Sequence, residues 1–273
     1  MLAFKALAER FMAACLTRHP VSATYLGVAG HDGELPDLGE AAFGQWARDV
    51  AGWQEAVTAL PVDALSKDEQ IDRELLLCAL AREEIAADFA AWRRSPEPYG
   101  KAADGVLALF LMPAADEGAR VTSVHSRFKQ IPDLLEQGMT NLQPESASRL
   151  LVERELKAAR ANAQFLGELL PQPVEDGQLA WKLQTAAGQA AEASLRFARF
   201  LEGLSPKARG DFAFGEGRYT DLLCRAELLA TTPVQLALRA KTVSDELGSE
   251  LEKNERILKD GYRDAGEGPG DPQ

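Results

Sequence analysis

The chain has 273 residues, of which 46% are hydrophobic and 26% are charged, the ordinary balance of a soluble globular protein. Its 42 acidic and 30 basic residues give a formal net charge of −12. Such a charge repels phosphate backbones and anionic lipid headgroups, and the basic residues are scattered among acids instead of forming a patch. We therefore expect neither a nucleic acid nor a membrane as a partner.

The cysteines and the N-terminal segment bear on the cellular compartment. Cys15, Cys78 and Cys224 lie far apart inside apolar helical patterns and form no C-x-x-C pair, which predicts buried thiols in a reducing compartment. The opening MLAFKALAER carries charged residues where a signal peptide needs an apolar run, so we interpret it as helical. The longest apolar run, VLALFLM at 106–112, is too short to span a bilayer. The expected location is cytoplasmic.

Apolar residues recur at three- and four-residue steps along most of the chain, the period of one face of an α-helix. The first such segment, 4–15, should end near Arg18, because Pro20 disfavours helical geometry at the preceding residue. A second helix is expected after Asp37, its predicted N-cap. Its core-facing row is Phe43, Trp46, Val50 and Trp53.

The middle of the chain continues the helical pattern. Ser66 followed three residues later by Glu69 is a capping-box pattern, which predicts the start of a helix with its body at about 71–92. The segment RRSPEPYG interrupts the period, and the apolar run after it fits either a buried helix or a short strand. The helical period returns over about 116–141, with a bend expected at Pro132.

The last part of the chain is also helical in pattern. Its cleanest apolar row is Val152, Leu156, Ala159, Ala163, Leu166 and Leu170. Further helices are expected at 181–201, 219–229 and 236–258, with the irregular LSPKARGDFAFGEGRYT between the first two. No alternation runs long enough to build a sheet, so the sequence predicts an all-α protein of long, mostly antiparallel helices. We expect one helical domain at 1–262 and a disordered, polar tail at 263–273.

The residue types for metal or nucleophilic chemistry are sparse. His19, His31 and His125 are the only histidines, and no two of them are four residues apart as in an H-E-x-x-H helix. No G-x-S-x-G elbow occurs, and GEGRYT lacks the third glycine and the preceding strand of a nucleotide-binding loop. We therefore expect no metal ion, no catalytic triad and no cofactor in this chain.

Four residues beside glycine-containing irregular segments are candidates for facing a cleft: Tyr99, Asp211, Glu216 and Tyr219. The sequence favours a structural interpretation even for these. A tyrosine ring can anchor a loop in the core while its hydroxyl makes one hydrogen bond, and loop acids are commonly solvated.

The segment RHPVSATYLGVAGHDGELPD at 18–37 holds two of the three histidines and several acids. It offers imidazoles and carboxylates but lacks the partners that hydrolysis would need. Its prolines and glycines are turn residues, so we predict a helix-to-helix connection. Tyr25 and Leu26 are expected to pin this connection to the core.

Sequence blocks stand in a fixed order over almost the whole chain: HPVSATYLGVAGHDGELPDL, DEQIDRELLLCAL, WRRSPEPYG, QIPDLLEQGMTNLQPES and GEGRYTDLLCRAELLATTP. Together they resemble the bacterial "domain of unknown function 885" family. That family looks like a branch of the gluzincin-like helical zinc metallopeptidases, with an H-E-x-x-H helix and a further glutamate ligand in its C-terminal half. The chain resembles only the N-terminal half, so no catalytic or metal-binding residue carries over, and zinc is implied only for the full-length family.

The resemblance implies a non-catalytic helical lobe that forms one wall of a substrate channel and is inactive alone. Such a chain would be a truncated product or a gene that kept the lobe without the chemistry. Its partner would be the missing C-terminal lobe or another protein, bound through an exposed apolar face. The alternative is a self-sufficient helical binding or scaffolding protein. A third hypothesis is an enzyme with an unrecognised site built from Asp211, Glu216, Tyr219 and partners distant in the sequence.

Overall fold

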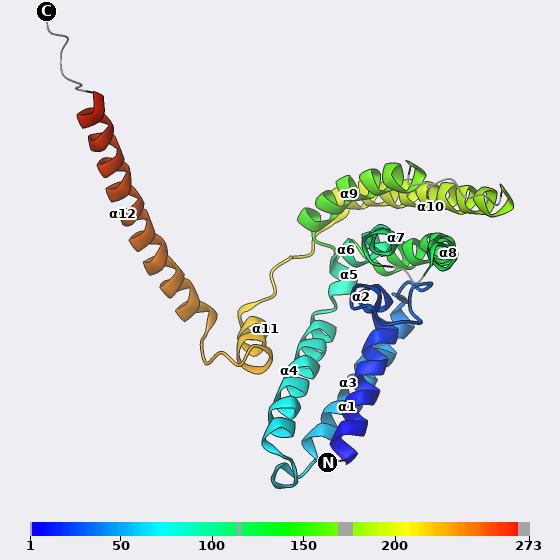
Figure 1. Cartoon of the computed structure of the whole chain (residues 1–273), viewed down its shortest axis with the longest axis horizontal. Helices are drawn as coiled ribbons and strands as arrows, with labels where there is room; N and C mark the ends of the chain where they lie inside the picture. The colour runs from blue at the N-terminus through cyan, green and yellow to red at the C-terminus, as the bar shows by residue number, and fades with distance from the viewer. Residues whose placement is uncertain (1, 114–115, 169–176, 267–273) are drawn as a thin grey trace, which may run out of the picture. The chain divides into compact units, whose positions relative to one another are not determined.

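The computed structural model describes residues 2–113, 116–168 and 177–266 (Figure 1). Their elements are helical throughout, which confirms the all-α prediction, and an isolated bridge joins Ser148 to Gly210. The chain divides into two compact units, 1–214 and 215–273.

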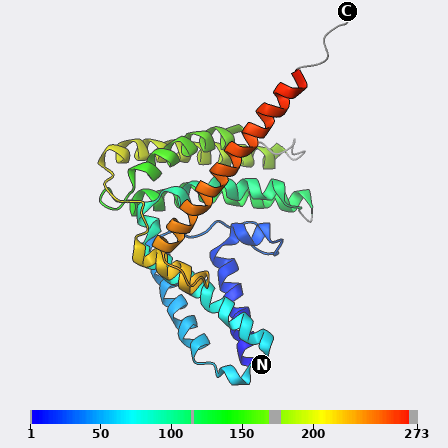
Figure 2. The same ribbon diagram turned by 90° about the vertical axis from the view of Figure 1, so that its left-hand side faces the viewer.

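Unit 1 contains most of the helices and begins with a group at its N-terminal end. This group comprises α1 (Leu2–Arg18), α2 (Pro20–Tyr25), α3 (Glu40–Thr58), η1 (Val62–Ala64) and α4 (Lys67–Phe89). The rest of unit 1 comprises α5 (Ala91–Arg94), α6 (Glu97–Gly100), α7 (Ala102–Leu111), α8 (Glu117–Asn141), α9 (Arg149–Glu168), α10 (Gly177–Leu204) and η2 (Ser205–Lys207). In Figures 1 and 2, α1, α3 and α4 lie side by side, and α8, α9 and α10 form a second group.

Each helix group of unit 1 encloses its own buried cluster. In the first group, the predicted row of α1 is buried at Phe4, Leu7 and Phe11, and it packs against Trp46 and Val50 of α3. Burial of such side chains is the main favourable term in folding. The second cluster joins α7 to α10, so the apolar run at 106–112 belongs to a buried helix and not to a strand.

Several local predictions are confirmed. Ser66 and Glu69 form the capping box of α4: the Glu69 amide donates to Ser66 Oγ at 3.2 Å, and the Ser66 amide donates to Glu69 Oε2 at 2.9 Å. The predicted row of α9 is buried at Val152, Ala159, Ala163 and Leu166, while Leu170 lies outside the described residues. These features depend on residues a few positions apart, which is why the sequence reveals them.

Two local predictions are wrong. The N-cap of α3 is Gly39, and Asp37 instead accepts a hydrogen bond from the Gly39 amide at 2.9 Å. Tyr25 and Leu26 do not pin the 18–37 segment, since they are 44% and 69% exposed. Both stand at the end of the short helix α2, whose buried side is formed by Pro20, Ala23 and Thr24.

Arg127 of α8 is the residue that ties the 18–37 segment down. Its side chain is fully buried, and its Nη2 donates to Thr24 Oγ1 at 2.7 Å and to the His31 carbonyl at 3.2 Å. Its Nη1 donates to the carbonyl of Gly105 in α7. Burial lowers the pKa of Arg127 to about 10, so the guanidinium stays charged at neutral pH. One buried cation therefore joins α2, the following loop, α7 and α8.

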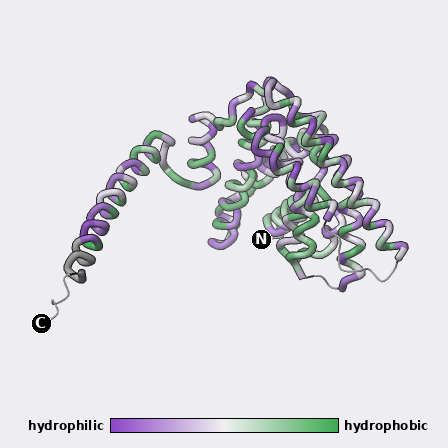
Figure 3. Tube along the Cα trace, turned by 90° about the horizontal axis from the view of Figure 1, so that it is seen from above, coloured by the Kyte–Doolittle hydropathy of each residue, from purple (hydrophilic) through white to green (hydrophobic). Residues whose placement is uncertain are grey.

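Unit 2 contains α11 (Glu216–Asp221), the π-helical turn η3 (Leu222–Ala226) and the 34-residue α12 (Pro233–Gly266). The helix predicted at 236–258 therefore forms as part of α12. Figure 3 shows hydrophilic and hydrophobic residues alternating along this helix. The large apolar side chains of its predicted row are exposed, including Leu247 at 59% and Leu251 at 62%. The predicted domain end at residue 262 falls inside α12, and 267–273 of the predicted tail lie outside the described residues.

Candidate functional site

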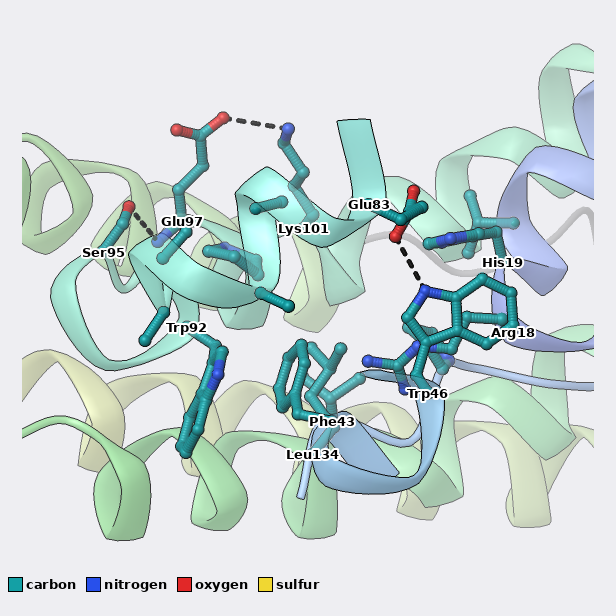
Figure 4. A pocket seen from close by; sticks show the side chains of 18 of the residues that line it. Arg18, His19, Phe43, Trp46, Glu83, Trp92, Ser95, Glu97, Lys101 and Leu134 are labelled. Carbon is teal, nitrogen blue, oxygen red and sulfur yellow. Dashed lines mark hydrogen bonds and ion pairs between the residues drawn. The ribbon is translucent and has the colours of Figure 1, made fainter. Parts of the chain in front are cut away.

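A cleft of about 1010 Å³ lies in unit 1, where the 18–38 segment meets α3, the end of α4, and residues 91–104 (Figure 4). Its walls are largely apolar, with aromatic rings from α3 and α5. Pockets of several hundred to about 1,000 Å³ with apolar walls and a few polar groups are the usual form of small-molecule sites. The 18–37 segment is thus more than a connection, because it supplies one wall of this cleft.

The floor of the cleft carries a stack of rings and guanidinium groups. Phe43 of α3 and Trp92 of α5 stack with their ring centroids 4.9 Å apart and an interplanar angle of 7°. Arg18 lies over the Phe43 ring at 4.6 Å, and Arg93 lies over a Trp92 ring at 4.5 Å. Cation–π contacts of this kind stabilise a flat aromatic surface while keeping the charges close to it.

The other end of the cleft contains Trp46, Glu83 and His19, which gather together in Figure 4. Trp46 Nε1 donates a hydrogen bond to Glu83 Oε2 at 2.7 Å. The His19 ring meets the Trp46 ring edge-on, with 6.2 Å between centroids. Burial lowers the pKa of His19, and this outweighs the opposite effect of the Glu83 carboxylate. The imidazole is therefore neutral at pH 7.

The charged groups of the cleft differ in how they are paired. Arg93 forms an ion pair with Glu40, and Lys101 forms one with Glu97 at 2.9 Å. Arg18 donates to the Asp37 backbone carbonyl but has no carboxylate within ion-pair distance among the described residues. Likewise, no described cation lies within ion-pair distance of Glu83.

The four predicted cleft residues are placed elsewhere, and none is among the described residues that line this cleft. Tyr99 is fully buried behind it, where its hydroxyl donates to the Trp92 carbonyl at 2.8 Å and accepts from Asn141 Nδ2 at 3.0 Å. Burial raises the pKa of Tyr99 to about 12. Asp211 is exposed and accepts from the Ala213 amide at 2.9 Å, the geometry of a turn.

Glu216 and Tyr219 belong to α11 in unit 2, and both are exposed. The structure therefore describes Tyr99 and Asp211 in one unit and these two residues in the other. Whether any of them contacts a ligand remains a prediction.

Sequence reasoning missed the residues that do line the cleft, above all Arg18, Phe43, Glu83 and Trp92. Helical periodicity assigns Phe43 to an inward row but cannot distinguish a core from a cleft wall. One feature of the sequence that could indicate this cleft is the run WRR at 92–94, in which an aromatic residue and two arginines follow the end of a helix.

The thiols and the potential metal ligands are scattered over the part of the chain that the structure describes. No three His, Cys, Asp or Glu side chains gather there in a way that could hold a metal ion. All three cysteines are free, and burial raises the pKa of Cys15 to about 11. Cys78 is buried as expected, but Cys224 is exposed, because only Leu223 and Ala226 of its π-helical turn face inward. None of the described helices combines the length and hydropathy needed to cross a bilayer.

The fold and the cleft define an all-α protein in which helix ends and one long connection form an aromatic-walled cleft. The chain belongs to the family described as "Bacterial protein of unknown function (DUF885)", whose model matches residues 20–265. This confirms the family that the ordered sequence blocks indicated.

The chain is similar in fold to a solved structure of a "putative lipoprotein of unknown function" from Shewanella oneidensis, with a TM-score of 0.77 and 20% sequence identity. The match covers 95% of this chain and 48% of that chain, so the present chain spans about half the length of the similar protein. No curated protein matches the sequence.

Proposed function

We propose that this chain is a non-catalytic helical lobe of a longer, metallopeptidase-like protein, in which the cleft of unit 1 forms one wall of a substrate channel. The observation that carries the proposal is the cleft itself. Its volume of about 1010 Å³ and its stacked rings suit recognition of a ligand with apolar groups. Most of its charged groups pair with one another and so stabilise the wall of the cleft, as in the Arg93–Glu40 and Lys101–Glu97 pairs.

The exposed apolar row of α12 supports the lobe interpretation. Val243, Leu247, Leu251 and Leu258 are each between 44% and 62% exposed and recur at helical spacing. Contiguous apolar surface of this kind usually marks an interface. A second lobe, or another protein, would cover it. The similar fold that occurs as about half of a longer chain agrees with this arrangement.

The second candidate is a self-sufficient helical binding protein. The two buried clusters of unit 1 favour it, because they close around their own helices without a partner. The two candidates differ in solution behaviour. A lobe that has lost its covering partner should self-associate and bind a dye that reports exposed apolar surface, whereas a self-sufficient protein should elute as a single species with little dye binding.

The test of the proposal is a paired metal and peptide assay on the purified chain. The chain is incubated with excess Zn²⁺, dialysed, analysed for zinc, and then mixed with a peptide library that is followed by mass spectrometry. The proposal predicts no stoichiometric zinc and no cleavage. One zinc retained per chain together with cleaved peptides would overturn it.

The same proposal includes a cytoplasmic location, no cofactor in this chain, and no binding to nucleic acid or membrane surfaces. Free thiols and a net charge of −12 support these parts of it. Cell fractionation tests the location, and recovery of the chain in a membrane or periplasmic fraction would contradict it.

A further inference from the structure

We infer that the cleft of unit 1 binds a small zwitterion with an apolar body, with Glu83 holding the ammonium group and Arg18 holding the carboxylate. The ligand would occupy the same cleft that the proposed function treats as a wall of the substrate channel, so the inference rests on that function for the role of the cleft and adds the class of ligand. It concerns binding by this chain alone and requires no catalysis.

Glu83 is the site for a cation. It is half-buried at the cleft, and its carboxylate is held by the hydrogen bond from Trp46 Nε1 at 2.7 Å. That bond fixes Oε2 and leaves the carboxylate without a cation within ion-pair distance among the described residues. Asp104 also lines the cleft, but it is exposed and therefore well solvated. A partly desolvated carboxylate gains more from an ammonium donor than a solvated one does.

Arg18 is the site for an anion. Its guanidinium is half-buried, lies 4.6 Å from the centre of the Phe43 ring, and donates one hydrogen bond to the Asp37 carbonyl. A guanidinium has five N–H donors, so donors remain for a ligand carboxylate. The other two cations that line the cleft, Arg93 and Lys101, each have a carboxylate partner already.

The surface beside these two charges is apolar. Phe43 lies between Trp46 and Trp92 in Figure 4, and Leu134 lies beside it. This surface favours aliphatic or aromatic side chains over polar ones. A purely apolar ligand would take water away from Glu83 and Arg18 without offering either of them an opposite charge, which is unfavourable. A polyanion would meet Glu40, Glu83, Glu97 and Asp104 along the lining. A short peptide with free termini and apolar side chains would pair with both charges and pack against the apolar wall.

The probe is leucyl-leucine, compared with its N-acetyl and C-amide derivatives by isothermal titration calorimetry on the full chain. The unmodified dipeptide should bind about tenfold or more tightly than either derivative, because each derivative loses one charge-assisted hydrogen bond. These comparisons use the wild-type protein, so they do not depend on the folding of any variant.

Variants then assign each charge to its residue. Glu83→Gln keeps an acceptor for Trp46, and it should abolish the preference for the free amine while keeping the preference for the free carboxylate. Arg18→Gln should do the reverse. Glu136→Gln and Arg48→Gln, which change exposed charges outside the cleft, should keep both preferences.

Equal binding of the three dipeptide forms to the wild-type chain, or no binding at millimolar concentration, would overturn the inference. So would preferences that persist in both cleft variants. These failures differ from failure of the proposed function: zinc retention with peptide cleavage would refute the non-catalytic lobe and leave the binding result intact. Absence of dipeptide binding would leave the lobe assignment untouched.

Discussion

Glu155 of α9 is a buried carboxyl group whose proton should control the stability of unit 1. It is 6% exposed, and its Oε1 has no hydrogen-bond partner. The backbone of Gly100 lies against it so closely that a Cβ added there would be 1.7 Å from Oε1. Burial, with a contribution from the Glu97 carboxylate, raises the pKa of Glu155 from 4.5 to about 7.

The raised pKa of Glu155 determines the direction in which stability changes with pH. Between pH 4.5 and 7 the folded chain holds a proton that the unfolded chain releases, so stability falls as pH rises through this window and stays low above it. The full cost of ionising Glu155 is roughly 3 kcal/mol, from 1.36 kcal/mol for each unit of pKa difference. Glu155→Gln keeps the shape and removes the ionisation.

Urea unfolding followed by tryptophan fluorescence measures this effect, because all four tryptophans lie in unit 1. Between pH 5.5 and 8.5 the free energy of unfolding of the wild type should fall, relative to the variant, by roughly 2 kcal/mol. The exposed Glu136→Gln provides the control and should follow the wild-type profile. Parallel profiles for wild type and Glu155→Gln would contradict this prediction, because they would mean that Glu155 is ionised in the folded chain at no cost.

Further predictions concern close packing and the buried cation. Gly138→Ala places a Cβ 2.6 Å from Cγ of the buried Tyr99 ring, so it should lower the free energy of unfolding by roughly 1–3 kcal/mol. Gly188→Ala, on an open face of α10, should instead raise it by up to about 1 kcal/mol, and urea unfolding compares the two. Arg127→Met leaves three acceptors without their donor, so it should lower the free energy of unfolding by roughly 2–4 kcal/mol. It should also speed proteolysis within 18–37. An unchanged cleavage rate there would contradict the role of Arg127 in holding this segment in place.

The helices could be predicted well because their signals are local. The capping box at Ser66 and Glu69 involves a single turn, and the apolar rows of α1 and α9 involve residues three or four positions apart. Even the ambiguous run at 106–112 required only one choice between two element types. Such patterns survive because tertiary packing reinforces the local preference instead of opposing it.

The cleft could not be predicted, because it depends on contacts between distant segments. Phe43 and Trp92 stack across 49 positions of sequence. The tie made by Arg127 joins α8 to Thr24, more than 100 positions earlier, and a charged residue in the middle of a helix normally indicates solvent exposure. Periodicity identifies which residues share a face of a helix, and it carries no information about what that face meets.

A crystal structure of the chain soaked with leucyl-leucine would show whether the cleft of unit 1 is a binding site. We expect density for the dipeptide in this cleft, with its ammonium group at Glu83 and its carboxylate at Arg18. An empty cleft at saturating dipeptide, or a dipeptide bound elsewhere on the chain, would contradict it.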